Sequence, residues 1–143
     1  GKQEGAELLV GGGRPKDEKL HNGFFVEPTV FDRVQPGMRI AQEEIFGPVL
    51  SVLKFQDEEE AIHMANDNPY GLMSTIWTKD IGRAHRLIQE IDAGQVKVNQ
   101  FAGGGVIGLP FAPYKRSGFI HGGGYAGMLE YTKEKAVSIY IGR

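Results

Sequence analysis

The stretch that decides the fold reads Gln42-Glu43-Glu44-Ile45-Phe46-Gly47-Pro48-Val49, and it leads into the apolar residues 49–53. Proline fixes its own φ and disfavours helix in the residue before it, so the Gly47-Pro48 step predicts a turn that enters a strand. In an extended segment before that turn, Glu44 and Phe46 would project to the same side. A carboxylate beside an aromatic ring suits a ligand that carries hydroxyl groups next to a flat ring. The alternative is a solvated glutamate beside a core phenylalanine.

Strand and helix patterns alternate after this stretch. A buried strand is expected at 49–55, and Asp57 begins a helix whose apolar residues recur at helical spacing. A second strand is expected at 74–78, and Asp80 begins a second helix that Gly94 closes.

Val96 and Val98 make a third strand. Strands separated by helices pair in parallel with right-handed crossovers, so the sequence predicts an α/β fold with a parallel βαβαβ sheet covered on both faces. Residues 7–10 and 24–31 are expected to be further extended segments. Ligands bind beyond the carboxyl ends of such strands, so the glycine-rich loop 99–111 is a candidate channel wall, and the alternative is a surface loop.

The last segment, residues 135–141, alternates apolar and polar side chains, with Val137, Ile139 and Ile141 on one face. A single terminal strand needs a partner for its backbone. That partner is either a sheet of the same chain or a strand outside it.

Composition places the chain among globular proteins. It has 143 residues, of which 41% are hydrophobic and 24% charged. No apolar run approaches the roughly 18 residues of a membrane helix, and lysine and arginine are dispersed, so neither a membrane nor a nucleic acid is expected as a partner. The chain has no cysteine, and its four histidines lack the spacing of metal ligands, so no metal is expected.

Residues 43–49 resemble a signature in the catalytic domain of the aldehyde dehydrogenase superfamily. Five further segments resemble that family in the same order, namely residues 23–30, 68–72, 78–80, 94–99 and 110–118. The resemblance runs from about residue 1 to about residue 141, and it corresponds to roughly the last third of such an enzyme. It implies that residues 1–130 form the C-terminal part of a catalytic domain and that 131–143 form an oligomerisation strand.

The resemblance implies NAD or NADP as cofactor and a small-molecule aldehyde as substrate. Glu44 would hold the ribose hydroxyls of the nicotinamide half, and Phe46 would pack against the nicotinamide or its ribose. Phe101 and Phe111 would line the aldehyde tunnel. Asn99 and Lys115 are expected to be structural. A homo-oligomer and a cytoplasmic location are also expected.

Enzymes of this family attack the aldehyde with a cysteine thiolate, which this chain lacks. The nucleophile, the general-base glutamate and the dinucleotide-binding half would all precede residue 1, so the chain is expected to be a fragment with no catalytic residue and no activity alone. The alternative is a non-catalytic structural or interaction module that keeps the fold. After Ser117-Gly118 the family usually carries Gly-Arg-Glu, whereas this chain has Phe119-Ile120-His121.

Overall fold

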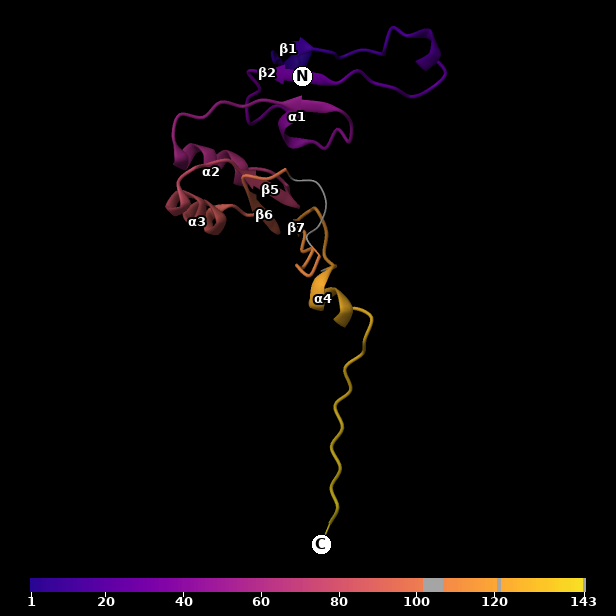
Figure 1. Cartoon of the computed structure of the whole chain (residues 1–143), viewed down its shortest axis with the longest axis vertical. Coiled ribbons are helices and arrows are strands. Elements are labelled where there is room, and N and C mark those ends of the chain that lie inside the picture. Colours follow the sequence, from indigo (N-terminus) through magenta and orange to yellow (C-terminus); the bar gives the residue numbers. More distant parts are fainter. Residues whose placement is uncertain (102–106, 121, 143) are drawn as a thin grey trace. The chain divides into compact units, whose positions relative to one another are not determined.

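A computed structural model of the whole chain describes residues 1–101, 107–120 and 122–142 (Figure 1). The chain divides into two compact units, Gly1–Asn68 and Pro69–Arg143. The expected boundary after residue 130 is a different division, between catalytic domain and oligomerisation strand, and it stays a prediction.

The first unit is built on a three-stranded sheet. β1 (Glu7–Val10) pairs antiparallel with β2 (Thr29–Asp32), and β2 pairs in parallel with β3 (Val49–Ser51). The Thr29 N–H also donates to the Pro48 carbonyl at 2.8 Å, which extends the β2–β3 ladder into the turn. The Gly47-Pro48 step therefore enters a strand, as the sequence predicts.

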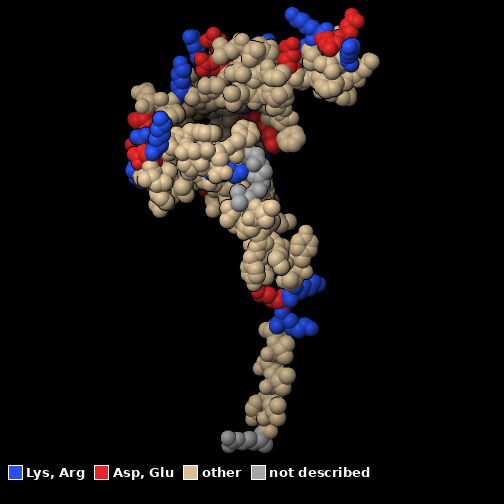
Figure 2. Space-filling view, in the orientation of Figure 1, with Lys and Arg blue, Asp and Glu red and all other residues tan. Residues whose placement is uncertain are grey.

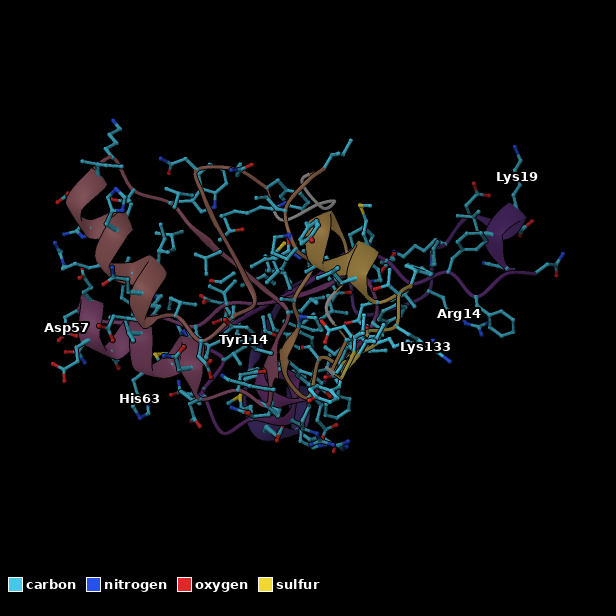
Figure 3. The ribbon with its side chains drawn as sticks, turned by 90° about the horizontal axis from the view of Figure 1, so that it is seen from below. Arg14, Lys19, Asp57, His63, Tyr114 and Lys133 are labelled. Atoms are coloured by element: carbon cyan, nitrogen blue, oxygen red, sulfur yellow. The ribbon has the colours of Figure 1, made fainter. Side chains whose placement is uncertain are left out.

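The helices of the first unit are short. They are the 3₁₀ turns η1 (Lys2–Glu4) and η2 (Glu18–Leu20) and the α-helices α1 (Arg39–Gln42) and α2 (Glu58–Asn66). Asp57, labelled in Figure 3, stands at the start of α2 and accepts a hydrogen bond from the Glu60 N–H at 2.9 Å. The Glu60 carboxylate accepts in turn from the Gln56 N–H at 2.6 Å. These two bonds confirm the predicted capping of α2.

The second unit contains the parallel βαβ unit. β5 (Met73–Ile76) and β6 (Gln95–Val98) pair in parallel over their full lengths and are joined by α3 (Ile81–Glu90). The Asp80 side chain accepts from the Arg83 N–H at 3.0 Å, so α3 begins where the sequence predicts. The remaining elements are β4 (Tyr70–Gly71), which pairs antiparallel with β7 (Tyr114–Lys115), and α4 (Gly124–Leu129).

The α/β class and the parallel βαβ sheet are confirmed, but the single βαβαβ sheet is wrong. Within the described residues β3 pairs with β2, whereas β5 and β6 form a sheet of their own. The alternation of strand and helix signals predicted the order of these elements, but the expected buried strand at 49–55 is shorter and less buried: β3 ends at Ser51, and Leu50 is 59% exposed. The alternation could not tell that β3 completes its hydrogen bonding with a strand that precedes it in the sequence.

The end of α3 is also corrected. The helix stops at Glu90, and Ile91 is already extended, so Gly94 does not close it. Gly94 is needed for a close approach instead, because a Cβ at this position would lie 1.3 Å from the Ala112 carbonyl oxygen. Its N–H donates to the Gly71 carbonyl at 2.9 Å, which ties the start of β6 to β4.

The C-terminal segment makes no strand within the part of the chain that the structure describes. Figure 1 draws the residues after α4 as an extended chain, and no backbone hydrogen bond joins 133–142 to a described strand. Residues 136–142 carry no charge, as the tan surface of this stretch in Figure 2 shows. Val137 is 70% exposed and Ile139 80%. The predicted pairing with another copy stays a prediction.

Candidate functional site

The backbone that leads to Glu44 is held by side chains from several parts of the first unit. The Arg39 N–H, the first of α1, donates to both carboxylate oxygens of Glu4 at 3.1 and 3.2 Å. The Gln42 side-chain amide donates to the carbonyls of Pro36 and Asp67, each at 2.8 Å. These contacts fix the end of α1 and hence the point from which Glu43 and Glu44 project.

Glu43 is paired with Arg39, one helical turn before it. The guanidinium donates through Nε to Glu43 Oε1 and through Nη2 to Oε2, both at 2.8 Å. This two-point hydrogen bond holds the pKa of the Glu43 carboxyl below its ordinary value and raises the pKa of the Arg39 guanidinium. Arg39 was not predicted from the sequence, although its four-residue spacing from Glu43 is a signal that could have found it.

Glu44 differs from its neighbour. Its carboxylate is exposed, and within the described residues it accepts no hydrogen bond and forms no ion pair. It lies in the wall of a pocket of about 630 Å³, open to solvent, so the free carboxylate can accept donors from a ligand. The other lining residues are Gly1, Lys2, Gln3, Glu4, Gly12, Phe31, Arg39, Ile40, Glu43 and Ile45.

The backbone at Phe46 is not extended, as the expected shared side of Glu44 and Phe46 would require. Its φ is 51°, in the left-handed region, so the simple alternation of an extended segment fails at this residue and the prediction that both side chains point the same way has no basis. The ring is 94% exposed and is not among the residues that line the pocket. Glu44 and Phe46 are close in the sequence, but only Glu44 lines the pocket.

The two candidate channel residues are described, but most of the loop between them is not. Phe101 is 84% exposed and Phe111 40%. Phe111 exchanges two backbone hydrogen bonds with Gly122, one of them from the Gly122 N–H to the Phe111 carbonyl at 2.8 Å. Residues 102–106 and His121 lie outside the described part of the chain. The role of Phe101 and Phe111 in a substrate channel remains a prediction.

Asn99 and Lys115, expected to be structural, both have left-handed φ angles, 52° and 51°. The Asn99 side chain bonds to both backbone groups of Thr78, and Lys115 Nζ lies 3.2 Å from Asp92 Oδ2. These contacts are compatible with a structural role, which stays a prediction.

Neither a metal site nor a membrane helix is found in residues 1–101, 107–120 and 122–142. No group of three or more His, Asp or Glu side chains gathers there in a way that could hold a metal ion. No helix in this part is long and apolar enough to cross a bilayer.

Residues 1–137 match the aldehyde dehydrogenase family, and the chain belongs to that family. It is 45% identical over its whole length to betaine aldehyde dehydrogenase of Brucella anthropi and 46% identical to that of Brucella melitensis. In both comparisons the chain spans 29% of the length of the curated relative.

Solved structures agree with this assignment. The aldehyde dehydrogenase of Mycobacterium tuberculosis, complexed with NAD+, is 44% identical and superposes with a TM-score of 0.90. The match covers all of this chain and 29% of the length of that enzyme's chain. The betaine aldehyde dehydrogenase of Staphylococcus aureus in complex with NAD+ is 44% identical and superposes with a TM-score of 0.87. This match covers 91% of the present chain and 26% of the length of the Staphylococcus chain.

Proposed function

We propose that this chain forms the C-terminal part of an NAD(P)-dependent aldehyde dehydrogenase that oxidises an aldehyde to a carboxylic acid. In this proposal residues 1–130 complete the catalytic domain and 131–143 supply an oligomerisation strand. The observation that carries it is the free Glu44 carboxylate in a pocket wall, within the segment that bears the family's signature. Relatives that match the chain are described as NAD+ complexes, which supports NAD as the first cofactor to test, with NADP as the other.

The residues present fit the ribose of such a cofactor. A ribose offers two neighbouring hydroxyl donors, and Glu44 offers two carboxylate oxygens that no described residue occupies. Phe46 offers an exposed ring that can pack against a flat heterocycle. When bound, the nicotinamide accepts the hydride that leaves the aldehyde carbon. What this chain contributes is the placement of the ribose, and with it the distance over which the hydride travels.

The chemistry at the aldehyde needs a group that this chain does not contain. A cysteine thiolate adds to the carbonyl carbon, the adduct loses hydride to become a thioester, and water then releases the acid and the thiolate. The sequence has no cysteine. The proposal therefore includes the expectation that the chain alone is inactive. Phe101 and Phe111 are proposed to line the path of the aldehyde.

Uncovered apolar surface supports the view that this chain works as part of a larger assembly. Few hydrophobic side chains are buried among the described residues. Large hydrophobic side chains are exposed instead, for example Leu50 at 59%, Trp77 at 70% and Ile81 at 73%. Leaving such side chains in water costs stability, so protein from elsewhere is expected to cover them. We include a homo-oligomer and a cytoplasmic location in the proposal.

The test is carried out on the intact enzyme that contains this chain. Purified enzyme is mixed with NAD and a panel of aldehydes, with betaine aldehyde included because of the relatives' names, and aldehyde-dependent NADH formation is followed by absorbance. The expected result is turnover by the intact enzyme and none by residues 1–143 alone. Intact enzyme that oxidises no aldehyde, yet remains folded, would favour the structural or interaction module instead.

The oligomerisation strand has its own test. Light scattering at micromolar concentration should give a multimer for the intact enzyme, because residues 135–141 present an unpaired backbone and an apolar face. Replacing Ile139 with lysine on that face should shift the enzyme toward smaller species. A monomeric unmodified enzyme would contradict the assignment of 131–143.

A further inference from the structure

Two adjacent carboxylates of the pocket wall stand in different states. Glu43 accepts both of its hydrogen bonds from Arg39 at 2.8 Å, whereas Glu44 has no described partner. Both residues and Arg39 itself line the same pocket. A two-point contact between a guanidinium and a carboxylate fixes the direction of both groups more tightly than a single contact does.

We propose that Arg39 is a positioning residue for Glu44: by holding Glu43, it leaves Glu44 as the one carboxylate of the pair that can accept the ribose hydroxyls of the cofactor. This inference rests on the proposed function, because it concerns the same cofactor. Beyond the family resemblance, it assigns a role to Arg39 and makes cofactor binding at Glu44 depend on the Arg39–Glu43 pair.

The charges around the pocket explain why the pair matters. Glu4, Glu43 and Glu44 bring three carboxylates to its wall, and Arg39 and Lys2 are the cationic side chains among the lining residues. Without Arg39, the Glu43 carboxylate is free beside Glu44, so that like charges crowd the site and two acceptors compete for one ribose. Without Glu43, the Arg39 guanidinium is free and can turn to Glu44, which would then be occupied. Either loss should weaken cofactor binding.

The backbone of Arg39 is anchored independently of its side chain. Its N–H is bonded to Glu4 and its carbonyl accepts from the Glu43 N–H at 2.7 Å. Changes to the Arg39 or Glu43 side chain therefore leave the main chain of α1 with its own contacts. This makes side-chain variants a fair test of positioning.

The experiment compares four variants of the intact enzyme, Arg39→Met, Glu43→Gln, the double variant R39M/E43Q, and Arg39→Lys. The dissociation constant of NAD is measured by titration calorimetry, the melting temperature by calorimetric scanning, and KM and kcat by steady-state kinetics. Each of the first two variants should bind NAD about two- to fivefold more weakly, the range that an exposed ion pair can supply. The double variant should return to within about twofold of the unmodified enzyme, because Glu44 is again free.

Glu43→Gln is the decisive arm. If Arg39 and Glu43 acted only through their net charge, removing a negative charge near an anionic dinucleotide would leave NAD binding unchanged or tighten it, the reverse of the expected weakening. Arg39→Lys keeps the charge without the planar fork and should recover part of the loss. The KM for NAD should rise more than the KM for the aldehyde.

Three outcomes would overturn the inference. They are Glu43→Gln binding NAD as tightly as the unmodified enzyme, additive losses in the double variant, and a fall in melting temperature with no change in NAD affinity. Because NAD binding is measured directly, an enzyme that binds NAD but oxidises no aldehyde would refute the proposed function, and the NAD affinities of the variants could still be compared. An unmodified enzyme that binds no NAD would refute both.

Discussion

Asn99 and Thr78 are joined by two hydrogen bonds that run in opposite directions. Asn99 Nδ2 donates to the Thr78 carbonyl at 2.7 Å, and the Thr78 N–H donates to Asn99 Oδ1 at 2.9 Å. Asn99 follows β6 directly, and Thr78 lies two residues after β5, so the contact ties together the carboxyl ends of the two parallel strands. Asn99 has φ 52°, a conformation that asparagine tolerates better than most residues.

Substitution of Asn99 should separate the contribution of the hydrogen bonds from that of the backbone. Asn99→Gly loses both bonds but accepts the left-handed conformation, and it should cost about 1 kcal/mol because the bonds are exposed. Asn99→Ala adds the strain of a Cβ at positive φ and should cost about 2 kcal/mol. Chemical denaturation of the intact enzyme gives the free energies of unfolding, and hydrogen exchange of the Thr78 amide reports the local effect. Equal losses in the two variants would refute the backbone contribution.

Gly94 should tolerate no side chain. A Cβ there would overlap the Ala112 carbonyl oxygen, so Gly94→Ala must push the segment before β7 away from β6. Crowding of this kind costs typically 1–3 kcal/mol, and a contact with rigid backbone should reach the upper end. Gly37→Ala is the matched control, because a Cβ at Gly37 meets no atom within 4 Å. The midpoint of thermal unfolding should fall for Gly94→Ala alone, and similar midpoints for both variants would contradict the packing described for β4, β6 and β7.

The start of α3 should loosen in acid. The hydrogen bond from the Arg83 N–H holds the pKa of the Asp80 carboxyl below its ordinary value, with further lowering by the Gly82 N–H and by the Arg83 and Arg86 charges, against an opposing effect of burial. A lowered folded-state pKa means that the stabilisation is present above the ordinary aspartate pKa of about 3.9 and is lost as the pH falls through the lowered value.

Hydrogen exchange of the Arg83 amide, followed from neutral pH into that acid range, should report this loss in the intact enzyme. Asp80→Asn keeps an acceptor oxygen but cannot titrate, so its protection should be lower at neutral pH and should lack the additional loss in acid. If both proteins lost protection in parallel as the pH fell, the Asp80 charge would not be the cause.

Local signals were read correctly from the sequence because they act over a few residues. Asp57 and Asp80 begin their helices through contacts three residues away, and Gly47-Pro48 fixes its turn through the geometry of one ring. The pairing of β3 with β2 could not be predicted in this way, because Val49 and Thr29 are brought together by the fold and not by any periodicity. The role of Gly94 could not be predicted either, because it depends on Ala112, which is distant in the sequence.

The candidate site was predicted in part. Glu44 was identified from its place in a carboxylate, aromatic and Gly-Pro sequence, and it does lie in a pocket wall. The left-handed φ of Phe46 was not predicted, because no neighbouring residue in the sequence indicates such a conformation for an aromatic residue. Arg39 was missed for a different reason. Its spacing from Glu43 is a common helical pattern, and only the structure shows that this pair stands beside Glu44.

Glu44 offers the sharpest test of the proposed site. Hydride transfer requires the nicotinamide to be held at one place against the substrate, whereas acyl transfer requires the nucleophile and water but no positioned nicotinamide. Enzymes that this chain resembles can show an esterase side reaction, which uses the nucleophile and water but needs no positioned nicotinamide. A carboxylate that only places the ribose should therefore affect one reaction and spare the other.

Glu44→Gln in the intact enzyme should weaken productive placement of the cofactor by roughly 10- to 150-fold, because charge-assisted hydrogen bonds to the ribose become neutral ones. NAD affinity and aldehyde-dependent NADH formation should fall, and hydrolysis of an aryl ester should be largely retained. Glu59→Gln, on the exposed surface of α2, is the matched control for loss of one carboxylate and should leave all three measurements unchanged. If Glu44→Gln left NAD affinity and hydride transfer intact, or removed the esterase activity together with the fold, Glu44 would be a surface or structural carboxylate and the ribose assignment would be wrong.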